Sequence, residues 1–327
     1  MAQSGSALRW GCRGRRFKSC RPDHFSPFFG IFIMSTKPTV GWIGLGVMGL
    51  SMAKNLLNQG VELCVYSRTK EKAIPLLNSG ASWVNTPAEL TPKVDYLFSM
   101  VGYPKDVESI YFDDDGVFST LESGQVLIDM TTSSPLLAER IAEKAKNFGS
   151  FSLDAPVSGG DVGAKKGSLA IMCGGEEEIY DRCRTLLEIM GTNIQLFGSA
   201  GSGQRVKMSN QILIASTMIG TVEALLYADK ANLDLKKVIH LIGQGAAGCW
   251  SLNQLGPRMV QEDWAPGFFV KHFIKDMGIA LEDAARMNLK LKGLELAKSF
   301  YEQVKDAGYS ENGTQVLLKV LRGLNQQ

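Results

Sequence analysis

Short apolar runs alternate with amphipathic segments along residues 39–197, and each run has the length of a buried strand. The runs cover residues 39–43, 62–66, 96–100, 126–129, 151–154, 169–173 and 194–197. Strands separated by helices are typical of βαβ units. The pattern therefore predicts a mostly parallel sheet covered by helices.

The pattern changes after the glycine-rich segment 198–203. Residues 204–325 contain no run with the properties of a strand, and residues 204–232 lack proline and are rich in Ile, Leu, Met and Ala. That composition predicts a long buried helix. We therefore expect an α/β domain over residues 36–198 and an all-α domain over residues 199–327.

The longest apolar stretch, residues 212–226, carries Ser216, Thr217, Thr221 and Glu223. A segment of about 20 residues that spans a bilayer rarely holds so many polar side chains together. We therefore expect a soluble protein that has no membrane partner.

Residues 1–33 differ from the rest of the chain. They are rich in arginine, contain Asp23 as their one acidic residue, and end in an apolar patch over residues 28–33. An organelle-targeting peptide and a secretory signal are two interpretations of this composition. We favour a third, in which residues 1–33 are a non-core extension and the true start is Met34, and on that basis we expect a cytoplasmic protein.

Composition and charge narrow the class of function. The 327 residues are 45% apolar, which is enough for about two folded domains, and 35 Lys and Arg against 33 Asp and Glu leave a net charge of +2. This balance does not favour nucleic acid as a partner. The six cysteines form no C-x-x-C pair and the three histidines are far apart, so we expect no metal site.

A glycine-rich turn follows the first predicted strand and opens a helix. It reads Gly44, Leu45, Gly46, Val47, Met48, Gly49, which is the G-x-G-x-x-G spacing of a dinucleotide-binding turn. Gly44 permits the turn, Gly46 lets the backbone approach a pyrophosphate, and Gly49 lets the helix lie against the strand. The motif in this context predicts a Rossmann-type domain that binds a nicotinamide dinucleotide.

Two further segments at strand ends concern the cofactor. Ser67, Arg68 and Thr69 follow the second strand, where a site that prefers NAD would place an acidic residue. A guanidinium pairs with a 2′-phosphate, so we expect NADP as the preferred cofactor and NAD as the alternative, although Arg68 is also explained as a solvated surface residue. Thr132 is placed to contact the nicotinamide side, or else caps the following helix, a role that Ser133 or Ser134 would also fill.

The segments that carry chemistry lie further along the chain. Ser158, Gly159 and Gly160 follow a strand and offer a hydroxyl and backbone amides to an anion, although a plain turn explains them equally well. Lys207, Asn210 and Gln211 share one face of the long helix. A lysine among apolar neighbours has a lowered pKa, which suits proton exchange with a substrate oxygen, whereas the alternative is a lysine that extends from a buried helix to solvent.

Together the motifs at residues 41–56, 154–160, 201–210 and 275–276 resemble the β-hydroxyacid dehydrogenase family. The resemblance implies Lys207 as the catalytic acid/base, Asn210 as its partner, and Thr132 and Lys275 as cofactor contacts. It further implies that Ser158, Gly159 and Gly160 hold a substrate carboxylate. Gln211 stands where many relatives have a second asparagine, and we place it among the substrate-binding residues.

The resemblance also implies the reaction, which is reversible hydride transfer between nicotinamide and a short hydroxy acid. The candidate substrates are of the 3-hydroxyisobutyrate, tartronate semialdehyde, glyoxylate or succinic semialdehyde type, and a homodimer or homotetramer is expected. One alternative is a catalytically silent NADP-binding module that senses redox state or docks a partner. A decarboxylase similar to 6-phosphogluconate dehydrogenase is disfavoured, since the helical part is short and residues for a sugar phosphate are not evident.

Overall fold

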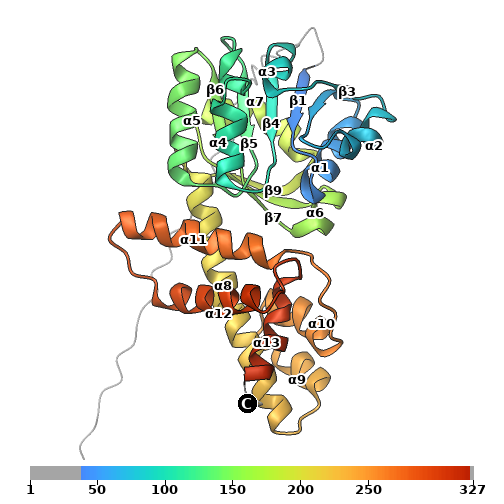
Figure 1. The fold of residues 1–327 in the computed structure, drawn as a ribbon, viewed down its shortest axis with the longest axis vertical. Coiled ribbons are helices and arrows are strands. Elements are labelled where there is room, and N and C mark those ends of the chain that lie inside the picture. The colour runs from blue at the N-terminus through green and yellow to red at the C-terminus, as the bar shows by residue number, and fades with distance from the viewer. Residues whose placement is uncertain (1–37, 325–327) are drawn as a thin grey trace, which may run out of the picture. The chain divides into compact units, whose positions relative to one another are not determined.

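The computed structural model describes residues 38–324, which belong to one compact unit. The expectations for residues 1–33 and for Met34 therefore lie outside the described residues. Within the unit, a part that contains all the named strands is followed by a part built from helices (Figure 1).

The main sheet has six parallel strands in the order β3-β2-β1-β4-β5-β6. Their bounds are β1 (Thr39–Ile43), β2 (Glu62–Tyr66), β3 (Ser82–Trp83), β4 (Tyr96–Ser99), β5 (Val126–Asp129) and β6 (Phe151–Asp154). The direction of progression along the sheet reverses between β1 and β4. Ligands of such sheets bind outside the carboxyl ends of the strands at this point.

A second, three-stranded sheet has the order β7-β8-β9, with β7 (Val157–Ser158) antiparallel to β8 (Leu169–Cys173) and β8 parallel to β9 (Gly191–Leu196). The sequence predicted neither β3 nor β7, because two-residue strands carry no periodic signal. It also predicted that β9 begins at residue 194. Thr192 and Asn193 are exposed, so the first half of β9 lacks the apolar pattern of a buried strand.

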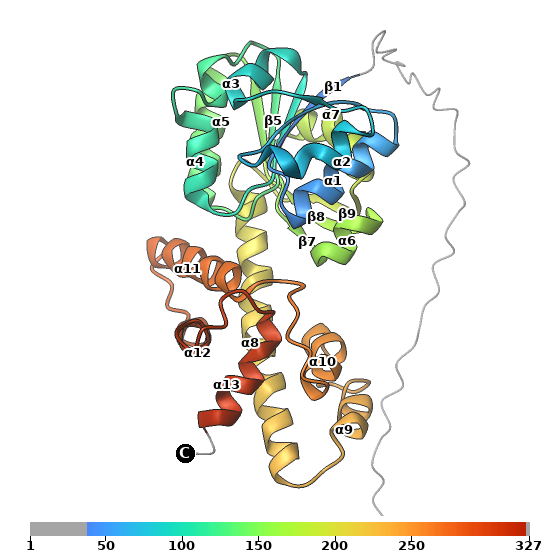
Figure 2. The ribbon, with the colours of Figure 1, turned by 45° about the vertical axis from the view of Figure 1, so that its right-hand side comes forward.

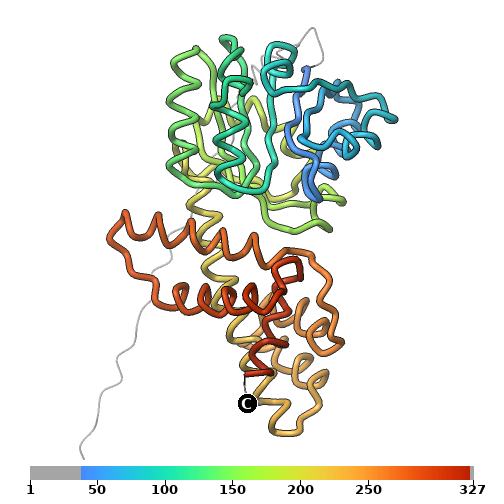
Figure 3. The backbone as a smooth tube through the Cα atoms, in the orientation of Figure 1, coloured from blue at the N-terminus to red at the C-terminus, as the bar shows by residue number. Residues whose placement is uncertain are grey.

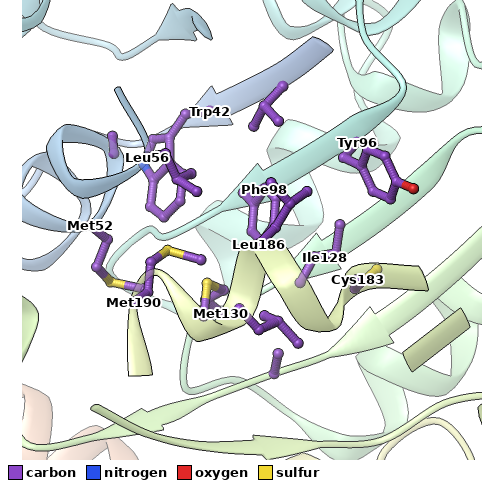
Figure 4. Close-up of a cluster of buried hydrophobic side chains, with 14 of the residues drawn as sticks. Trp42, Met52, Leu56, Tyr96, Phe98, Ile128, Met130, Cys183, Leu186 and Met190 are labelled. Atoms are coloured by element: carbon purple, nitrogen blue, oxygen red, sulfur yellow. The ribbon is translucent and has the colours of Figure 1, made fainter. Parts of the chain in front are cut away.

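Helices cover both faces of the main sheet. They are α1 (Val47–Asn58), α2 (Ile74–Leu77), α3 (Pro87–Leu90), α4 (Pro104–Phe112), α5 (Pro135–Asn147), α6 (Gly160–Lys166) and α7 (Glu177–Glu188). Alternate strand residues serve the two faces, as the period of a strand requires. Trp42 and Phe98 stack on one face, near Met52 of α1 and Leu186 of α7 (Figure 4). Leu97 and its neighbours pack on the other face with α4 and α5.

The helical part is organised around α8 (Ser202–Lys230), close to the predicted span of 204–232. The other helices are α9 (Leu235–Ile242), a π-helical segment (Ser251–Leu255), α10 (Gly256–Val260), α11 (Val270–Arg286), α12 (Lys292–Asp306) and α13 (Leu317–Leu324). Figure 2 shows α11 and α12 on one side of α8, whereas α9 and α10 lie on its other side. The chain passes between the two parts once, at the start of α8 (Figure 3).

Among the described helices, α8 alone is long and apolar enough to cross a membrane. Its buried residues, however, pack within the protein. Ala215, Met218, Val222 and Leu225 of α8 form a core with Phe273 of α11 and further residues of α12 and α13. The core helix of a folded protein satisfies the same criteria of length and composition.

Candidate active site

The glycine-rich turn lies at the carboxyl end of β1, where the sheet reverses direction. Gly44 has φ +95°, and a Cβ atom at this position would overlap the carbonyl oxygen of Met100 at the end of β4. Its amide donates to the carbonyl of Tyr66 at the end of β2. Only glycine meets both demands, so Gly44 closes the turn between the three neighbouring strands.

Gly46 differs from Gly44 because no contact within residues 38–324 requires a glycine there. A Cβ atom on Gly46 would have no neighbour within 4 Å, and the residue is exposed. It forms the N-cap of α1, which has no side-chain cap and no acidic residue in its first turn. An open approach to uncapped helix amides fits the pyrophosphate of a dinucleotide. Leu45 is buried, while Val47 and Met48 begin the helix.

Ser67, Arg68 and Thr69 lie just beyond the end of β2. The Nη1 atom of Arg68 is 3.0 Å from Oδ1 of Asp106 in the first turn of α4. Within the described residues, the hydroxyls of Ser67 and Thr69 make no hydrogen bond. This segment therefore offers one guanidinium and two uncommitted hydroxyls beside the glycine-rich turn, as a 2′-phosphate would require.

A chain of hydrogen bonds connects the strand ends with α8. The amide of Val101, after β4, donates to Oγ1 of Thr131, after β5, at 3.0 Å. Nε2 of Gln204 donates to the carbonyl of Thr131 at 2.7 Å, and Oε1 of Gln204 accepts from the amide of Ser133 at 2.9 Å. Because Gln204 is fully buried, both bonds are shielded from water. The loop after β5 is therefore fixed to the first turn of α8.

Asp129 orders the same loop from within the sheet. Its Oδ1 accepts from Oγ of Ser99 at 2.8 Å and from the amide of Thr131 at 3.1 Å. Burial raises the pKa of Asp129 to about 6, and the hydrogen bonds from Thr131 and Ser99 oppose this shift. The hydroxyl of Ser133 is buried without a hydrogen-bond partner among the described residues. A ligand beside this loop would supply a hydrogen-bond partner for this hydroxyl.

The N-terminus of α8 is held by Asp154, which ends β6. Oδ1 of Asp154 accepts from the amide of Gly201 and Oδ2 from the amide of Gln204, both at 2.7 Å. The carboxylate thus replaces a side-chain cap that the helix itself lacks. A Cβ atom on Gly203 would overlap the carbonyl of Met172, so glycine allows α8 to start directly against β8.

Lys207 lies one turn beyond Gln204 and is 7% exposed. Its ammonium makes no hydrogen bond or ion pair with any residue between 38 and 324. Burial lowers the pKa of Lys207 to about 8, an effect that nearby Asp276 opposes and Lys275 strengthens. A buried lysine that titrates near neutrality and has no partner is suited to exchange a proton with a bound molecule.

A polar cluster joins α8, α11 and the loop after β5. Nε2 of Gln211 donates to Oδ2 of Asp276 at 2.6 Å, and Nζ of Lys275 lies 3.0 Å from Oδ1 of Asp276. Nζ of Lys275 also donates to the carbonyl of Thr132 at 2.6 Å. The structure thus brings together Gln211, Lys275 and Thr132, which the sequence placed in one site from widely separated segments.

Two predicted groups of site residues are arranged differently. Asn210 donates to Oε1 of Gln211 at 2.7 Å and makes no hydrogen bond to Lys207. Gly159 and Gly160 have φ +132° and +63°, which explains the glycines at the end of β7. No hydrogen bond or ion pair joins Ser158 to Lys207 among the described residues. Ser158 pairs with Ala170 of β8, and the start of α8 at Gly203 packs against Met172 of the same strand.

The sequence alone did not indicate roles for Gln204, Asp154 and Asp276. Asp276 directly follows Lys275, and Asp154 lies four residues before Ser158 in the same motif, so proximity to predicted site residues was the available signal. Nothing in the sequence distinguishes Gln204 from an ordinary polar residue. Among residues 38–324, no group of His, Cys, Asp and Glu is arranged to hold a metal ion.

Comparison with known proteins assigns the chain to a protein family. Residues 39–198 match the family model described as the NAD binding domain of 6-phosphogluconate dehydrogenase, and residues 201–321 match that described as NAD-binding of NADP-dependent 3-hydroxyisobutyrate dehydrogenase. The chain is 46% identical to the probable 3-hydroxyisobutyrate dehydrogenase-like 1, mitochondrial, of Arabidopsis thaliana, over 90% of this chain and 88% of that protein. It is 36% identical to 2-hydroxy-3-oxopropionate reductase of Escherichia coli, over 86% of this chain and 96% of that protein.

A solved structure is similar over nearly the same range. The 3-hydroxyisobutyrate dehydrogenase of Mycobacterium tuberculosis with L-serine has a TM-score of 0.81 and 27% identity, covering 88% of this chain and 100% of that chain. These similarities agree with the Rossmann-type sheet, the helical C-terminal part and the glycine-rich turn. The chain belongs to the β-hydroxyacid dehydrogenase family and is an NAD(P)-dependent oxidoreductase that acts on CH–OH groups.

Proposed function

We propose that the protein is an NADP-preferring dehydrogenase of short hydroxy acids that uses Lys207 as its acid/base. The observation that carries the proposal is the buried side chain of Lys207, whose ammonium has no partner among the described residues, one turn beyond Gln204 and its bond to the loop after β5. The polar cluster of Gln211, Asp276 and Lys275 fixes the helices around it.

The glycine-rich turn at Gly44, Gly46 and Gly49 would hold a nicotinamide dinucleotide, which when bound would supply or accept the hydride. Lys207 exchanges the proton: as ammonium it donates to the oxygen of a carbonyl under reduction, and as neutral amine it accepts the proton of the alcohol under oxidation. Asn210 and Gln211 lie on α8 together with Lys207 and orient the substrate oxygen. Lys275 bonds the loop at Thr132 to α11, which orders the site on the side of the cofactor.

The substrate that we propose is a small carboxylate. Ser158 and the turn at Gly159 and Gly160 receive its carboxylate, with Ser158 as a hydroxyl donor. The Escherichia coli relative is named for 2-hydroxy-3-oxopropionate and the Arabidopsis relative for 3-hydroxyisobutyrate. Compounds of this size, together with glyoxylate and succinic semialdehyde, are the candidates.

The preference for NADP rests on Arg68. It is the one guanidinium in the segment that follows β2, and Ser67 and Thr69 flank it with free hydroxyls. No acidic residue stands in this segment to hold the two ribose hydroxyls of NAD. NAD is the weaker alternative.

The test measures consumption of NADPH and of NADH with glyoxylate, succinic semialdehyde, tartronate semialdehyde and methylmalonate semialdehyde. Lys207→Ala should lower turnover by about 10²- to 10⁴-fold and leave NADPH affinity nearly unchanged, because the lysine acts on the substrate proton. Lys230→Ala, at the exposed end of the same helix, is the matched control and should behave as the wild type. Tight NADPH binding without turnover on any substrate, and no effect of Lys207→Ala, would instead favour the silent module.

The assembly that we propose is a homodimer or homotetramer formed through α8. Its outward residues repeat at intervals of three and four along the helix: Ser209, Leu213, Ser216, Gly220, Glu223 and Tyr227. Leu213 is 65% and Tyr227 77% exposed, and these two exposed apolar side chains on a stripe of this spacing suit a second copy of the same helix. Leu213→Glu should reduce the mass found by light scattering to that of the monomer, whereas Gln303→Glu, at an exposed position of α12 outside the stripe, is the charge control.

For the cellular location, we propose the cytoplasm. The cysteines of the described chain, Cys64, Cys173, Cys183 and Cys249, are all free thiols, as suits a reducing compartment. Fluorescent fusions of the full chain and of the chain that starts at Met34 test this proposal. Import of the full chain into an organelle would overturn it and would support targeting by residues 1–33.

A further inference from the structure

The ion pair between Arg68 and Asp106 crosses the end of β1. Arg68 follows β2 and Asp106 lies in α4, which follows β4, while β1 runs between β2 and β4 in the sheet. The glycine-rich turn at the end of β1 therefore lies between the segments that carry the two residues. A cofactor ribose held at the end of β2 must share this space with the ion pair.

The two partners are not equally fixed. The side chain of Asp106 is 11% exposed, whereas that of Arg68 is 77% exposed. Asp106 stands in the first turn of α4, where the helix dipole favours a carboxylate, and its Oδ2 atom lies over Gly102, 3.3 Å from the position of a Cβ atom there. Asp106 is thus the anchored member of the pair, and Arg68 has the freedom to exchange it for another anion.

We propose that Asp106 limits the preference for NADP by competing with the 2′-phosphate for Arg68. A guanidinium that binds the phosphate must give up or share the carboxylate, and the carboxylate repels the phosphate dianion. A 2′-hydroxyl makes no such demand, so NAD binds with the ion pair intact. Asp106 is therefore a specificity-determining residue; this role rests on the proposed binding of the 2′-phosphate by Arg68.

The experiment titrates the folded full chain with NADPH and NADH by nicotinamide fluorescence, and with adenosine 2′,5′-bisphosphate and 5′-AMP by calorimetry. Asp106→Asn keeps the shape of the side chain and its place at the helix N-terminus but removes the charge. It should tighten binding of NADPH and of the bisphosphate by about three- to tenfold and change NADH and AMP by less than about twofold, in line with an exposed ion pair and the loss of one like charge. The gain should shrink as salt is added.

The matched control is Glu108→Gln on the same helix. Glu108 pairs with Arg140 of α5 at 2.8 Å and is half exposed, so the change removes the same charge two residues away without touching Arg68. It should leave all four affinities unchanged. Asp106→Ser is a second replacement that removes the charge and keeps a short polar side chain in the first turn of α4, and it should repeat the effect of Asp106→Asn if that variant folds poorly.

The outcomes separate this inference from the proposed function. If Arg68→Ala loses NADPH affinity but Asp106→Asn leaves it unchanged, Asp106 does not compete and the inference fails while the NADP preference stands. If Asp106→Asn weakens NADPH, the carboxylate orients Arg68 instead of competing for it, which also overturns the inference. If Arg68→Ala changes neither cofactor, the proposed role of Arg68 fails, and the inference fails with it.

Discussion

The burial of Lys207 lowers its pKa and thereby determines the chemistry that its side chain can perform. Its side chain is buried near the start of α8, and its ammonium has no hydrogen-bond partner among the described residues. Asp276, which would stabilise the charge, is already engaged by Gln211 and Lys275. The lysine is therefore destabilised as a cation and available to a substrate, which is the combination that proton transfer near neutral pH needs.

The first prediction at this scale concerns the pH profile. Burial lowers the pKa of Lys207 to about 8, so the ammonium that donates the proton during reduction is lost as the pH rises through this value. The rate of carbonyl reduction at saturating NADPH should fall above about pH 8, and the rate of alcohol oxidation should rise over the same range. Steady-state rates in both directions from pH 6 to 10 test this. Identical profiles in the two directions would contradict the assignment.

The second prediction concerns stability. The pKa of Lys207 is lowered from 10.5 in the unfolded chain to about 8, so the unfolded state binds more protons between these values and stability rises with pH there. The cost of the buried charge is complete below about pH 8. Lys207→Met should therefore raise the free energy of unfolding at pH 7 by about 1 to 3 kcal/mol while it abolishes turnover. Urea denaturation of both proteins at pH 7 and pH 10 measures the effect, which should diminish at pH 10.

At the scale of the element, α8 shows how a helix is aimed. Its first turn lacks a capping side chain of its own, and Asp154 at the end of β6 supplies the acceptors. Gly203 lets the helix begin in contact with β8. Because α8 is a rigid rod, its first turn decides where Lys207 lies, one turn further along.

Removal of the cap that Asp154 gives to α8 should displace Lys207, although Asp154 makes no hydrogen bond to it. Asp154→Ala leaves the amides of Gly201 and Gln204 buried without an acceptor, and we expect a loss of about 2 kcal/mol in unfolding free energy. The kcat should fall because Lys207 shifts, while the affinity for NADPH, measured by fluorescence titration, stays within about twofold because the glycine-rich turn is unaffected. Asp181→Ala, an exposed aspartate of α7, is the control and should change neither quantity.

At the scale of the whole described chain, the strand-bearing and helical parts meet through named polar contacts. Gln204 bonds the loop after β5 at two points, and Lys275 bonds the same loop from α11. Arg205 adds a pair with Glu139 of α5 at 2.9 Å and with Asp283 of α11 at 3.4 Å. A single peptide connection and these contacts therefore hold the strand-bearing part and the helical part together.

The prediction at this scale removes the central contact. Gln204→Ala leaves the carbonyl of Thr131 and the amide of Ser133 without their partners, which costs about 1 to 3 kcal/mol for each buried group. Hydrogen exchange followed by mass spectrometry should show faster exchange in the first turns of α8 and in the loop after β5, with no change in α12. Faster exchange throughout residues 38–324 would mean that the contact supports global stability and does not specifically join the two parts.

Local patterns in the chain were sufficient for much of the fold. The strand ranges of β1, β2, β5, β6 and β8 follow directly from apolar runs bounded by turns, and the absence of proline over residues 204–232 marks α8. The two-residue strands β3 and β7 and the exposed start of β9 escaped prediction, because edge pairing depends on neighbours and not on local hydrophobicity. For the same reason, the sequence did not predict that the strands divide into two sheets.

The sequence by itself determined the residue types of the site: the glycines of the turn, Arg68 after β2, and a lysine and two amides on one helical face. Those properties depend on spacing and on intrinsic chemistry, which are local. Only the tertiary structure decided which groups they meet. The pairing of Arg68 with Asp106, the bond from Lys275 to Thr132 and the cap that Asp154 gives to α8 join segments from different elements. The pKa of Lys207 is likewise set by its burial in the packed protein and by the charges of Asp276 and Lys275 on α11. Contacts and desolvation depend on packing in three dimensions, and no local pattern in the chain encodes them.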